Sequence, residues 1–234
     1  MRYFEHNPAN PVLSVLLPSR SRFSNLQNTI DSLAETVSDK RNVEVIVKFD
    51  DDDVASHSRI NEIRTDISVK CLVSSRRKGY ASLHEFSNEM LNSVTGTWVV
   101  FMNDDSFMAT PDFDNIILDT LPGSNFGGRP DFACLNPIAS HSQFPIVTSS
   151  ACKKLGYFAL HNHVDSFLQD VYGKFSAGVE VALHIGHYKS SMTDEIADSS
   201  NAAAMITSPT YGPFINANIK KIVQKIKKEI FNDR

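Results

Sequence analysis

The stretch WVVFMNDDSFM, residues 98 to 108, runs from apolar residues directly into an amide and two adjacent carboxylates. Trp98 to Met102 have the composition of a strand that is buried on both faces, whereas Asn103, Asp104 and Asp105 are strongly polar. Burying an unpaired carboxylate costs several kcal/mol. We therefore expect the end of this strand either to open to water or to meet a cation.

The residues before this stretch alternate between strand-like and helix-like patterns. Residues 12–18, 43–49 and 69–75 are short apolar runs, and residues 22–36 and 84–94 place apolar residues at helical spacing. A shorter helix-like segment contains Ile60 and Ile63. Continuous apolar strands that alternate with amphipathic helices indicate a parallel sheet covered on both faces. The predicted fold class is therefore α/β, a Rossmann-type, mostly parallel sheet with helices on both faces.

Polar clusters follow each of the four predicted strands. They are Pro18-Ser19-Arg20, Asp50 to Asp53, Arg76-Arg77-Lys78-Gly79 and Asn103-Asp104-Asp105. Ligands of such sheets bind beyond the carboxyl ends of the strands, so we expect these clusters to share one site. Carboxylates without cysteine favour Mg²⁺ or Mn²⁺, which proteins usually hold together with substrate phosphates. The sequence therefore indicates a divalent ion and a diphosphate-bearing substrate, whose phosphates the basic residues 76–78 could contact.

The second half of the chain is less regular. We expect a loop at 121–132, short strands at 132–138 and 145–151, a helix at 164–175, a late strand at 180–187 and a mobile loop at 190–209. Residues 215–231 form a terminal amphipathic helix with an isoleucine stripe and many lysines. Packing on the same domain is the favoured interpretation of this stripe, and a homodimer or a peripheral contact with an anionic membrane are the alternatives.

Composition excludes several classes of protein. The chain has 234 residues, of which 41% are hydrophobic and 21% charged, as in ordinary globular domains. A net charge of -4 argues against a nucleic-acid partner. Three widely spaced cysteines favour a reducing compartment, and the sequence has neither a membrane-spanning apolar run nor a signal-peptide pattern. We expect a cytoplasmic protein, either free or peripheral to the membrane.

Five stretches, taken in order, resemble the nucleotide-sugar-dependent glycosyltransferases of the GT-A fold, most closely the family 2-type group. They are VLSVLLPSRSRFSNLQNTIDSL, VEVIVKFDDDD, RRKGYASLHEFSNEMLNSVTGTWVVFMNDDS, HNHVDSFLQDV and ALHIGH, and together they cover roughly residues 10 to 190. The resemblance implies a metal-dependent, inverting sugar transfer from a nucleoside diphosphate sugar to a hydroxyl of a glycan, a lipid-linked sugar or a protein. It also implies a glycosyltransferase domain over residues 1–214, with a nucleotide-sugar half at about 10–110 and an acceptor half at about 111–190, followed by the basic amphipathic helix 215–234.

The same resemblance implies roles for individual residues. The nucleotide sugar would be bound by Pro18, Ser19, Arg20, Asp50, Asp51, Arg77, Gly79, Asn103 and Asp104. Asp105 would bind Mn²⁺ or Mg²⁺ with His184 or His187, and Asp165 would be the catalytic base, with Asp170 in reserve. Asn103 departs from the family's DxD motif, in which this position is an aspartate. The change removes one formal charge beside the metal, although an amide oxygen remains an acceptor.

Two other functions stay open at this stage. A nucleotidyltransferase could use a similar sheet and two carboxylates, but it should have a glycine-rich loop after the first strand, where PSRSRF has no glycine. A catalytically inactive relative that binds only a nucleotide or a glycan is the second alternative, and Asn103 is the residue that favours it.

Overall fold

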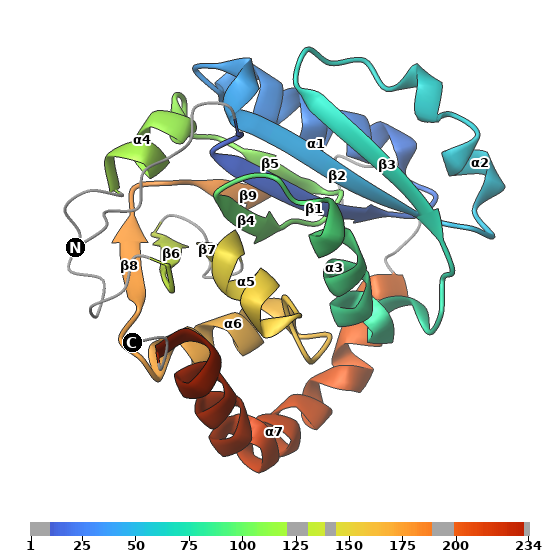
Figure 1. Ribbon diagram of the computed structural model, residues 1–234. Helices are drawn as coiled ribbons and strands as arrows, with labels where there is room; N and C mark the ends of the chain where they lie inside the picture. Colours follow the sequence, from blue (N-terminus) through green and yellow to red (C-terminus); the bar gives the residue numbers. More distant parts are fainter. Residues whose placement is uncertain (1–9, 121–130, 139–143, 189–198, 232–234) are drawn as a thin grey trace.

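The computed structural model describes residues 10–120, 131–138, 144–188 and 199–231 (Figure 1). Within these ranges the main sheet has the strand order β3-β2-β1-β4-β7-β6-β8. Its strands are β1 (Leu13–Ser19), β2 (Val43–Asp50), β3 (Ser68–Ser74), β4 (Trp98–Phe101), β6 (Cys134–Pro137), β7 (Ile146–Thr148) and β8 (Gly178–Val181). A second, two-stranded sheet pairs β5 (Ser106–Met108) with β9 (Ile185–His187).

The first half of the main sheet is parallel, as the sequence predicts. β1 pairs in parallel with β2 and β4, and β2 pairs in parallel with β3. The carboxyl ends of these four strands therefore lie along one edge of the sheet. Beyond β4 the direction changes, because β7 runs antiparallel to both β4 and β6, while β6 and β8 are parallel. The acidic motif follows the last of the four parallel strands, where this change occurs.

Helices cover both faces of the sheet, which confirms the predicted fold class (Figure 1). One face packs on α1 (Phe23–Thr36) and α4 (Phe113–Thr120), and the other on α3 (Leu83–Met90), α5 (Ser149–Leu155), α6 (Val164–Gly173) and α7 (Ser199–Ile226). Successive strand residues alternate between the two cores: Val15 and Leu17 face α1, and Leu16 faces α3. Because both faces are covered, every residue of β2 is buried, including the charged side chains of Glu44, Lys48 and Asp50.

The segment between β2 and β3 contains less helix than we predicted. Only α2 (Val54–His57) and a 3₁₀ turn, η2 (Ile60–Glu62), form there. Ile60 and Ile63 still pack against the core beside α1. The spacing of Ile60 and Ile63 therefore predicts their burial correctly, although only short helical turns form between the two strands.

Three predictions for the second half need correction. The predicted strand 145–151 stops at Thr148, where α5 begins. The predicted strand 180–187 is divided between β8 and β9, which belong to different sheets. The predicted mobile loop 190–209 is wrong from Ser199 onward, because α7 begins there and continues through Pro209 and Pro213. The predicted loop 121–132 lies largely outside the described residues.

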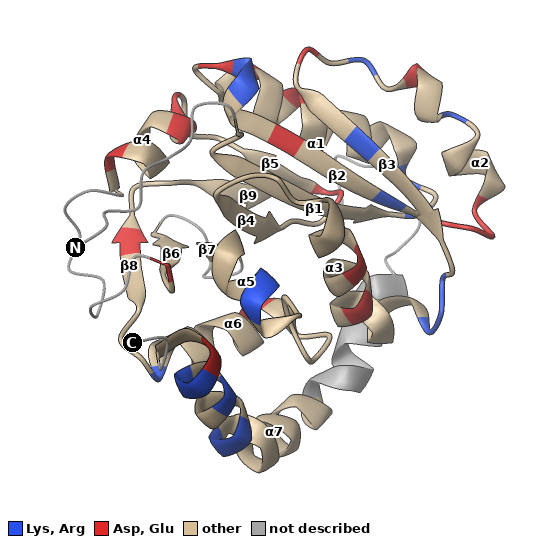
Figure 2. Ribbon diagram, in the orientation of Figure 1, with Lys and Arg blue, Asp and Glu red and all other residues tan. Residues whose placement is uncertain are grey.

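The apolar stripe of the terminal helix packs against other parts of the same chain. Ile215, Ile222, Ile226 and Ile230 are buried against α3, α5 and α6, and the helix ends in a π-helical turn, η6 (Lys227–Phe231). The lysines of this segment are exposed (Figure 2), although Lys225 also donates a hydrogen bond of 2.6 Å to the carbonyl of Leu155. The favoured prediction of packing is confirmed, so a membrane or dimer contact through this helix would have to use its lysine face. No helix in the described ranges is long and apolar enough to cross a bilayer.

Candidate active site

The backbone of the acidic motif is fixed by helix α1. Residues 103–105 form the turn between β4 and β5, closed by a hydrogen bond of 3.1 Å from the Ser106 amide to the Asn103 carbonyl. The buried Thr29 hydroxyl of α1 lies 3.0 Å from the Asp104 carbonyl oxygen and 2.7 Å from that of Ser106. α1 begins just after the loop that follows β1, so the first and last parallel strand ends are joined through this helix.

The three polar side chains of the motif have different surroundings. Asn103 is exposed, and Asp105 is partly exposed. Asp104 is buried, and its carboxylate accepts hydrogen bonds from Ser19 Oγ at 2.9 Å and Arg22 Nη1 at 3.3 Å. Burial raises the pKa of Asp104 to about 7, although Arg22 and Ser19 act in the opposite direction. Asp104 therefore anchors the motif to the β1 loop, whereas Asn103 and Asp105 face the open edge.

Asp105 and His187 are brought together by the small second sheet. β5 and β9 pair antiparallel with Ser106 opposite His187, and the Tyr188 amide donates to the Asp105 carbonyl at 2.8 Å. His187 Nδ1 lies 3.4 Å from Asp105 Oδ1. The neighbouring phenyl ring of Phe144 packs at 5.1 Å from the imidazole of His187. Of the two histidines that the sequence offered for the metal, the structure places His187 at the motif.

His184 occupies a different position. It precedes β9, its backbone amide donates to Thr110 Oγ1 at 2.7 Å, and its carbonyl accepts from the amide of Ala109. Its ring lies 6.3 Å from that of Phe107. His184 thus sits beyond the far end of β5, three residues along the strand from His187.

Arg22 is the cation that the acidic motif meets, and the sequence analysis did not identify it. Its Nη1 lies 3.3 Å from Asp104 Oδ1 and 3.6 Å from Asp105 Oδ2, and its side chain is 22% exposed. Arg22 is the residue that precedes α1, so the helix directs it across the edge of the sheet toward β4. The sequence signal for Arg22 was the second arginine of PSRSRF, but its spacing in the sequence could not show which carboxylates it would contact.

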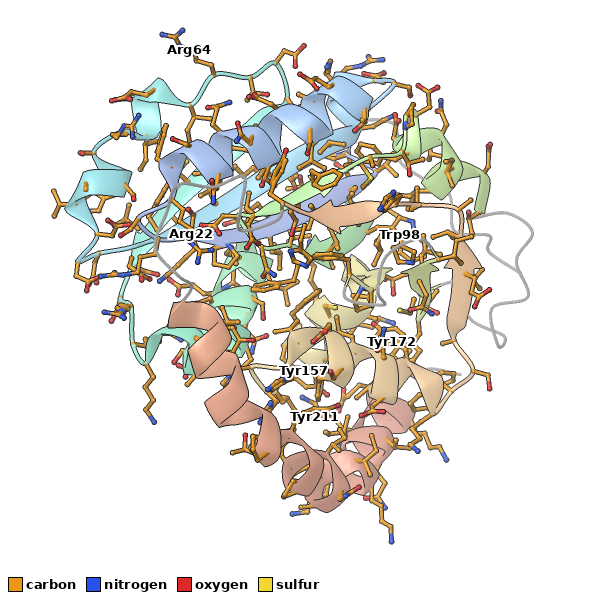
Figure 3. The ribbon with its side chains drawn as sticks, turned by 180° about the vertical axis from the view of Figure 1, so that it is seen from behind. Arg22, Arg64, Trp98, Tyr157, Tyr172 and Tyr211 are labelled. Atoms are coloured by element: carbon orange, nitrogen blue, oxygen red, sulfur yellow. The ribbon has the colours of Figure 1, made fainter. Side chains whose placement is uncertain are left out.

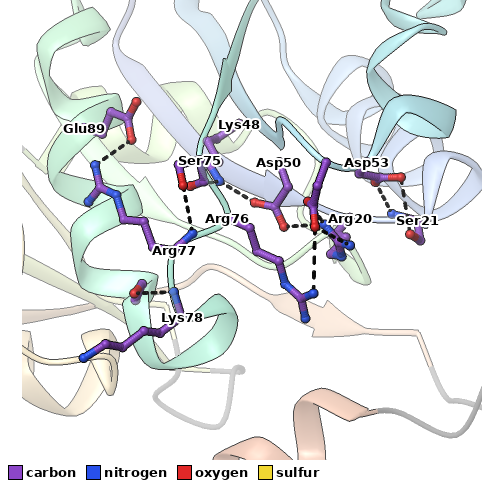
Figure 4. A network of polar contacts seen from close by, with 12 residues as sticks. Arg20, Ser21, Lys48, Asp50, Asp53, Ser75, Arg76, Arg77, Lys78 and Glu89 are labelled. Carbon is purple, nitrogen blue, oxygen red and sulfur yellow. Dashed lines mark hydrogen bonds and ion pairs between the residues drawn. The ribbon is translucent and has the colours of Figure 1, made fainter.

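The second strand end forms an ion-pair network around Asp50 (Figure 4). Asp50 is buried and accepts from Arg20 at 3.0 Å and from the buried ammonium of Lys48. Lys48 Nζ also lies 3.8 Å from the centre of the Phe86 ring. Arg20 reaches further to Asp52, with one N–O distance of 3.1 Å. Asp50 is therefore neutralised within the protein, while Asp51 is exposed at the same edge.

Asp53 extends this network to the β1 loop. It accepts from the backbone amide of Ser21 at 2.7 Å. Burial alone would raise the pKa of Asp53, but hydrogen bonds from Ser56 and Ser21 outweigh it and lower the pKa below its usual value. The loop that contains Ser19 and Arg20 is therefore held from the side of β2 as well as from the acidic motif.

The third strand end differs from the prediction at Arg77. The Arg77 guanidinium pairs with Glu85 at 2.8 Å and Glu89 at 3.3 Å, both on α3, whereas its neighbour Arg76 points toward Asp52, at 3.9 Å (Figure 4). Gly79 has a φ of +59°, a backbone conformation that favours glycine. The Gly79 turn thus places Arg76 in the cluster of strand ends and turns Arg77 away toward α3.

The two predicted catalytic acids lie on α6, which packs on α7 and β8. Asp165 is in the first turn of α6 and is partly buried. Asp170 is exposed one and a half turns later and accepts a hydrogen bond of 2.6 Å from the hydroxyl of Tyr211 on α7. Burial and the Asp170 carboxylate raise the pKa of Tyr211. Asp170 therefore has a structural partner, and Figure 3 shows Tyr211 on the side of the molecule where α6 and α7 meet.

Two further observations concern ligand space and metal capacity. A cavity of about 640 Å³ lies between α1 and the η2 segment, lined by Phe23, Gln27, Asn28, Arg59 and Arg64 among others, beside the acidic motif rather than at it. Within the described ranges, no three His, Cys, Asp or Glu side chains are arranged to hold a metal ion. Asp105 and His187 alone can contribute two ligands, which suits an ion whose remaining ligands come from phosphates and water.

Comparisons with known proteins show a partial match to one family model and a similarity of fold. Residues 14–118 match the model of Glycosyl transferase family 2, and no curated protein sequence matches the chain. Among solved structures, the mannosyltransferase PcManGT of Pyrobaculum calidifontis, in complex with GDP-Man and Mn²⁺, aligns with a TM-score of 0.51 at 15% identity. The alignment covers 68% of this chain and 52% of that chain, so the chain spans about half of PcManGT.

The S. aureus protein TarS, as its fragment 1–349, aligns over 94% of this chain and 72% of that chain, at 14% identity and a TM-score of 0.48. The family match covers the four parallel strands, helix α1 and the acidic motif, which are the parts that build the edge described above. Residues 14–118 are thus similar to the Glycosyl transferase family 2 model, and the fold of the chain is similar to that of PcManGT.

Proposed function

We propose that this protein transfers a sugar, with inversion, from a nucleoside diphosphate sugar to a hydroxyl of a glycan, lipid-linked or protein acceptor, with Mn²⁺ or Mg²⁺ as its cofactor. The observation that carries the proposal is the position of Asp105 and His187. Asp105 lies in the turn between β4 and β5 and His187 lies on β9, and their side-chain atoms are 3.4 Å apart at the carboxyl edge of the parallel strands. This is the edge at which α/β sheets bind their ligands.

The donor set at this edge fits a divalent ion that is held jointly with a diphosphate. Two ligands at right angles on an ion with bonds of about 2.1 Å are separated by roughly 3.0 Å, close to the observed spacing of Asp105 and His187. Neutral imidazole and carboxylate are both ligands of Mn²⁺. The complex of PcManGT with GDP-Man and Mn²⁺ supports the same assignment by analogy of fold. When bound, the ion neutralises the charge that develops on the departing nucleoside diphosphate.

The chain's own residues would bind and orient the donor. Asp51 and Asn103 are exposed after β2 and β4, the strands on either side of β1, where an amide or carboxylate can accept hydrogen bonds from a nucleobase and a ribose. The Arg20–Asp50–Lys48 network holds the strand ends proposed to contact the nucleobase in one conformation, because each charged group in it has a partner. Arg20 and Arg76, which both contact Asp52, provide positive charge above the same edge.

Asp165 is the proposed catalytic base, which would take the proton from the acceptor hydroxyl. It lies in the first turn of α6, and the hydroxyl of Tyr211 binds Asp170 rather than Asp165. A base must keep a carboxylate oxygen available for the acceptor, so this arrangement favours Asp165 over Asp170.

The function is tested by incubating the protein with a panel of UDP and GDP sugars and Mn²⁺ while measuring release of the nucleoside diphosphate. Release that requires both the metal and Asp105 supports the proposal. Formation of a nucleoside diphosphate sugar and pyrophosphate from a nucleoside triphosphate and a sugar phosphate would instead identify a nucleotidyltransferase. Calorimetric binding of UDP or GDP without turnover, over a broad panel of glycan acceptors, would identify an inactive relative.

A further inference from the structure

We propose that Arg22 is a built-in counter-cation of the acidic motif: it pairs with Asp104 and Asp105 while the donor is absent, and it binds the donor diphosphate once a divalent ion is bound at Asp105. This inference rests on the proposed function, because it concerns the same metal and donor. It assigns a donor-binding role to a residue outside the acidic motif of residues 103–105.

The geometry of Arg22 is the first argument. A single nitrogen, Nη1, lies between Oδ1 of Asp104 at 3.3 Å and Oδ2 of Asp105 at 3.6 Å. The other oxygen of Asp105, Oδ1, faces His187. Arg22 and the proposed metal position thus share the Asp105 carboxylate, and the distances from Nη1 to the two aspartates are longer than those of a tight ion pair. Such contacts are weaker than a fork-to-fork pair, so they can be exchanged.

The charges of the motif are the second argument. Asp104, Asp105 and Arg22 have formal charges that sum to -1, and Asn103 adds none. A divalent ion that approaches Asp105 is therefore repelled by Arg22, whereas an incoming diphosphate is attracted to it. The two ligands feel opposite effects from the same side chain. This opposition distinguishes a counter-cation from a residue that merely supports the local fold.

The direction of Arg22 is the third argument. It immediately precedes α1, on the loop that leaves β1, and its side chain is 22% exposed. A small change of rotamer would turn the guanidinium from the carboxylates to a phosphate at the same edge. The planar fork of arginine matches phosphate oxygens in a bidentate way, which a lysine cannot do.

The test compares Arg22→Met with Arg22→Lys and with Arg41→Met. Arg41 pairs with Asp39 before the first residue of β2, at the opposite end of the strands, so its variant removes the same charge away from the site. Mn²⁺ binding to the nucleotide-free proteins is measured by electron paramagnetic resonance. Binding of UDP and of GDP at saturating Mn²⁺ is measured by calorimetry, and thermal unfolding checks that each variant is folded.

We expect Arg22→Met to bind Mn²⁺ more tightly and the diphosphate more weakly, each by roughly fivefold, the size of effect that a partly exposed ion pair produces. Arg22→Lys should keep the wild-type affinity for Mn²⁺ and still lose affinity for the diphosphate, and Arg41→Met should change neither. Shifts of both affinities in one direction, a shift in only one, or no shift overturn the inference.

If Arg22→Met does not fold, Arg22→Lys decides, and an unchanged affinity for UDP and GDP overturns the inference. A wild-type protein that binds no Mn²⁺, with or without UDP or GDP, overturns the metal site and the inference together. Sugar transfer by the wild-type protein is measured separately. Transfer that persists while the Arg22 variants behave like wild type leaves the proposed function intact and removes only the role of Arg22.

Discussion

Replacing Glu44 by glutamine should destabilise the protein without altering the chemistry of the site. Glu44 lies near the start of β2, and its side chain is 2% exposed. Its Oε1 accepts from Ser14 Oγ and from the amides of Thr95 and Gly96, the latter at 3.2 Å. Its Oε2 accepts from Lys70 Nζ at 2.6 Å and Thr95 Oγ1 at 2.8 Å. The carboxylate thereby fixes the turn from which β4 runs to the acidic motif.

The size of the effect follows from these partners. In Glu44→Gln one oxygen becomes an NH₂ group, and either orientation of the amide places this donor against other donors. Turned toward Lys70, it loses two hydrogen bonds to a charged group, worth about 1.5–3 kcal/mol each. Removal of a buried charge offsets part of this loss. We expect the free energy of unfolding to fall by about 3–4 kcal/mol, which corresponds to a fall of roughly 6–16 °C in Tm.

The stability difference between wild type and Glu44→Gln should depend on pH in a direction that can be checked. Burial alone would raise the pKa of Glu44, but Lys70, Ser14 and Thr95 outweigh it and lower the pKa below its usual value. A carboxylate whose folded-state pKa is lowered stabilises the fold above its unfolded value, about 4.3, and loses this contribution as the pH falls through the folded-state pKa. The stability difference between wild type and Glu44→Gln should therefore be constant from about pH 6 to 8 and shrink below about pH 4.

Urea denaturation followed by circular dichroism at several pH values measures this difference directly. Binding of UDP or GDP with Mn²⁺ at low temperature should match wild type, because Glu44 lies at the opposite end of the strands from the site. A loss of less than about 1 kcal/mol at pH 7, or an equal loss at pH 7 and below pH 4, would refute the reasoning about charge-assisted bonds.

Five other variants have distinct expected results. Asp105→Asn should abolish Mn²⁺-dependent binding of UDP and GDP while Tm stays near wild type. His187→Ala should weaken this binding, whereas His184→Ala should not. Calorimetry measures the binding by all three variants, and equal effects of the two histidine variants would contradict the placement of the metal. Asp165→Asn should keep donor binding and lower turnover by roughly 10² to 10⁴, so a variant with wild-type rates of sugar transfer would remove Asp165 as the base. Gly96→Ala should lower Tm, because a Cβ there would lie 2.5 Å from a buried serine oxygen of β1 and 2.9 Å from a backbone nitrogen; an unchanged melting curve would show that β1 can move away.

Much of the first half of the chain could be predicted from the sequence because its signals are local. Strands β1, β2 and β4 are short apolar runs buried on both faces, so their composition alone identifies them. Parallel pairing follows from the helices between them, and it gathers the polar residues after each strand at one edge. The sequence alone therefore predicts that the acidic motif and the residues of the β1 loop share one site.

The second half could not be predicted as well, because its elements depend on distant partners. β9 has three residues and exists through its pairing with β5, which is equally short. Local periodicity did not separate β9 from β8, four residues earlier. Helix α7 continues through Pro209 and Pro213, although proline in a helix interior usually costs about 3 kcal/mol or more. Packing of its buried isoleucines on the second core opposes that cost, and this packing is a tertiary property.

The sequence by itself determined the first half of the sheet, the edge at which its polar clusters gather and the types of residue found there, because hydrophobic periodicity and strand ends can be recognised from consecutive residues. Only the tertiary structure decided which charges meet. It selected His187 over His184, turned Arg77 to α3 while Arg76 faced Asp52, closed Asp50 between Lys48 and Arg20, and directed Arg22 to the acidic motif. The physical reason is that Coulomb energy depends on the distance between side-chain atoms, and residues far apart in the chain acquire that distance only when the sheet and its helices have packed.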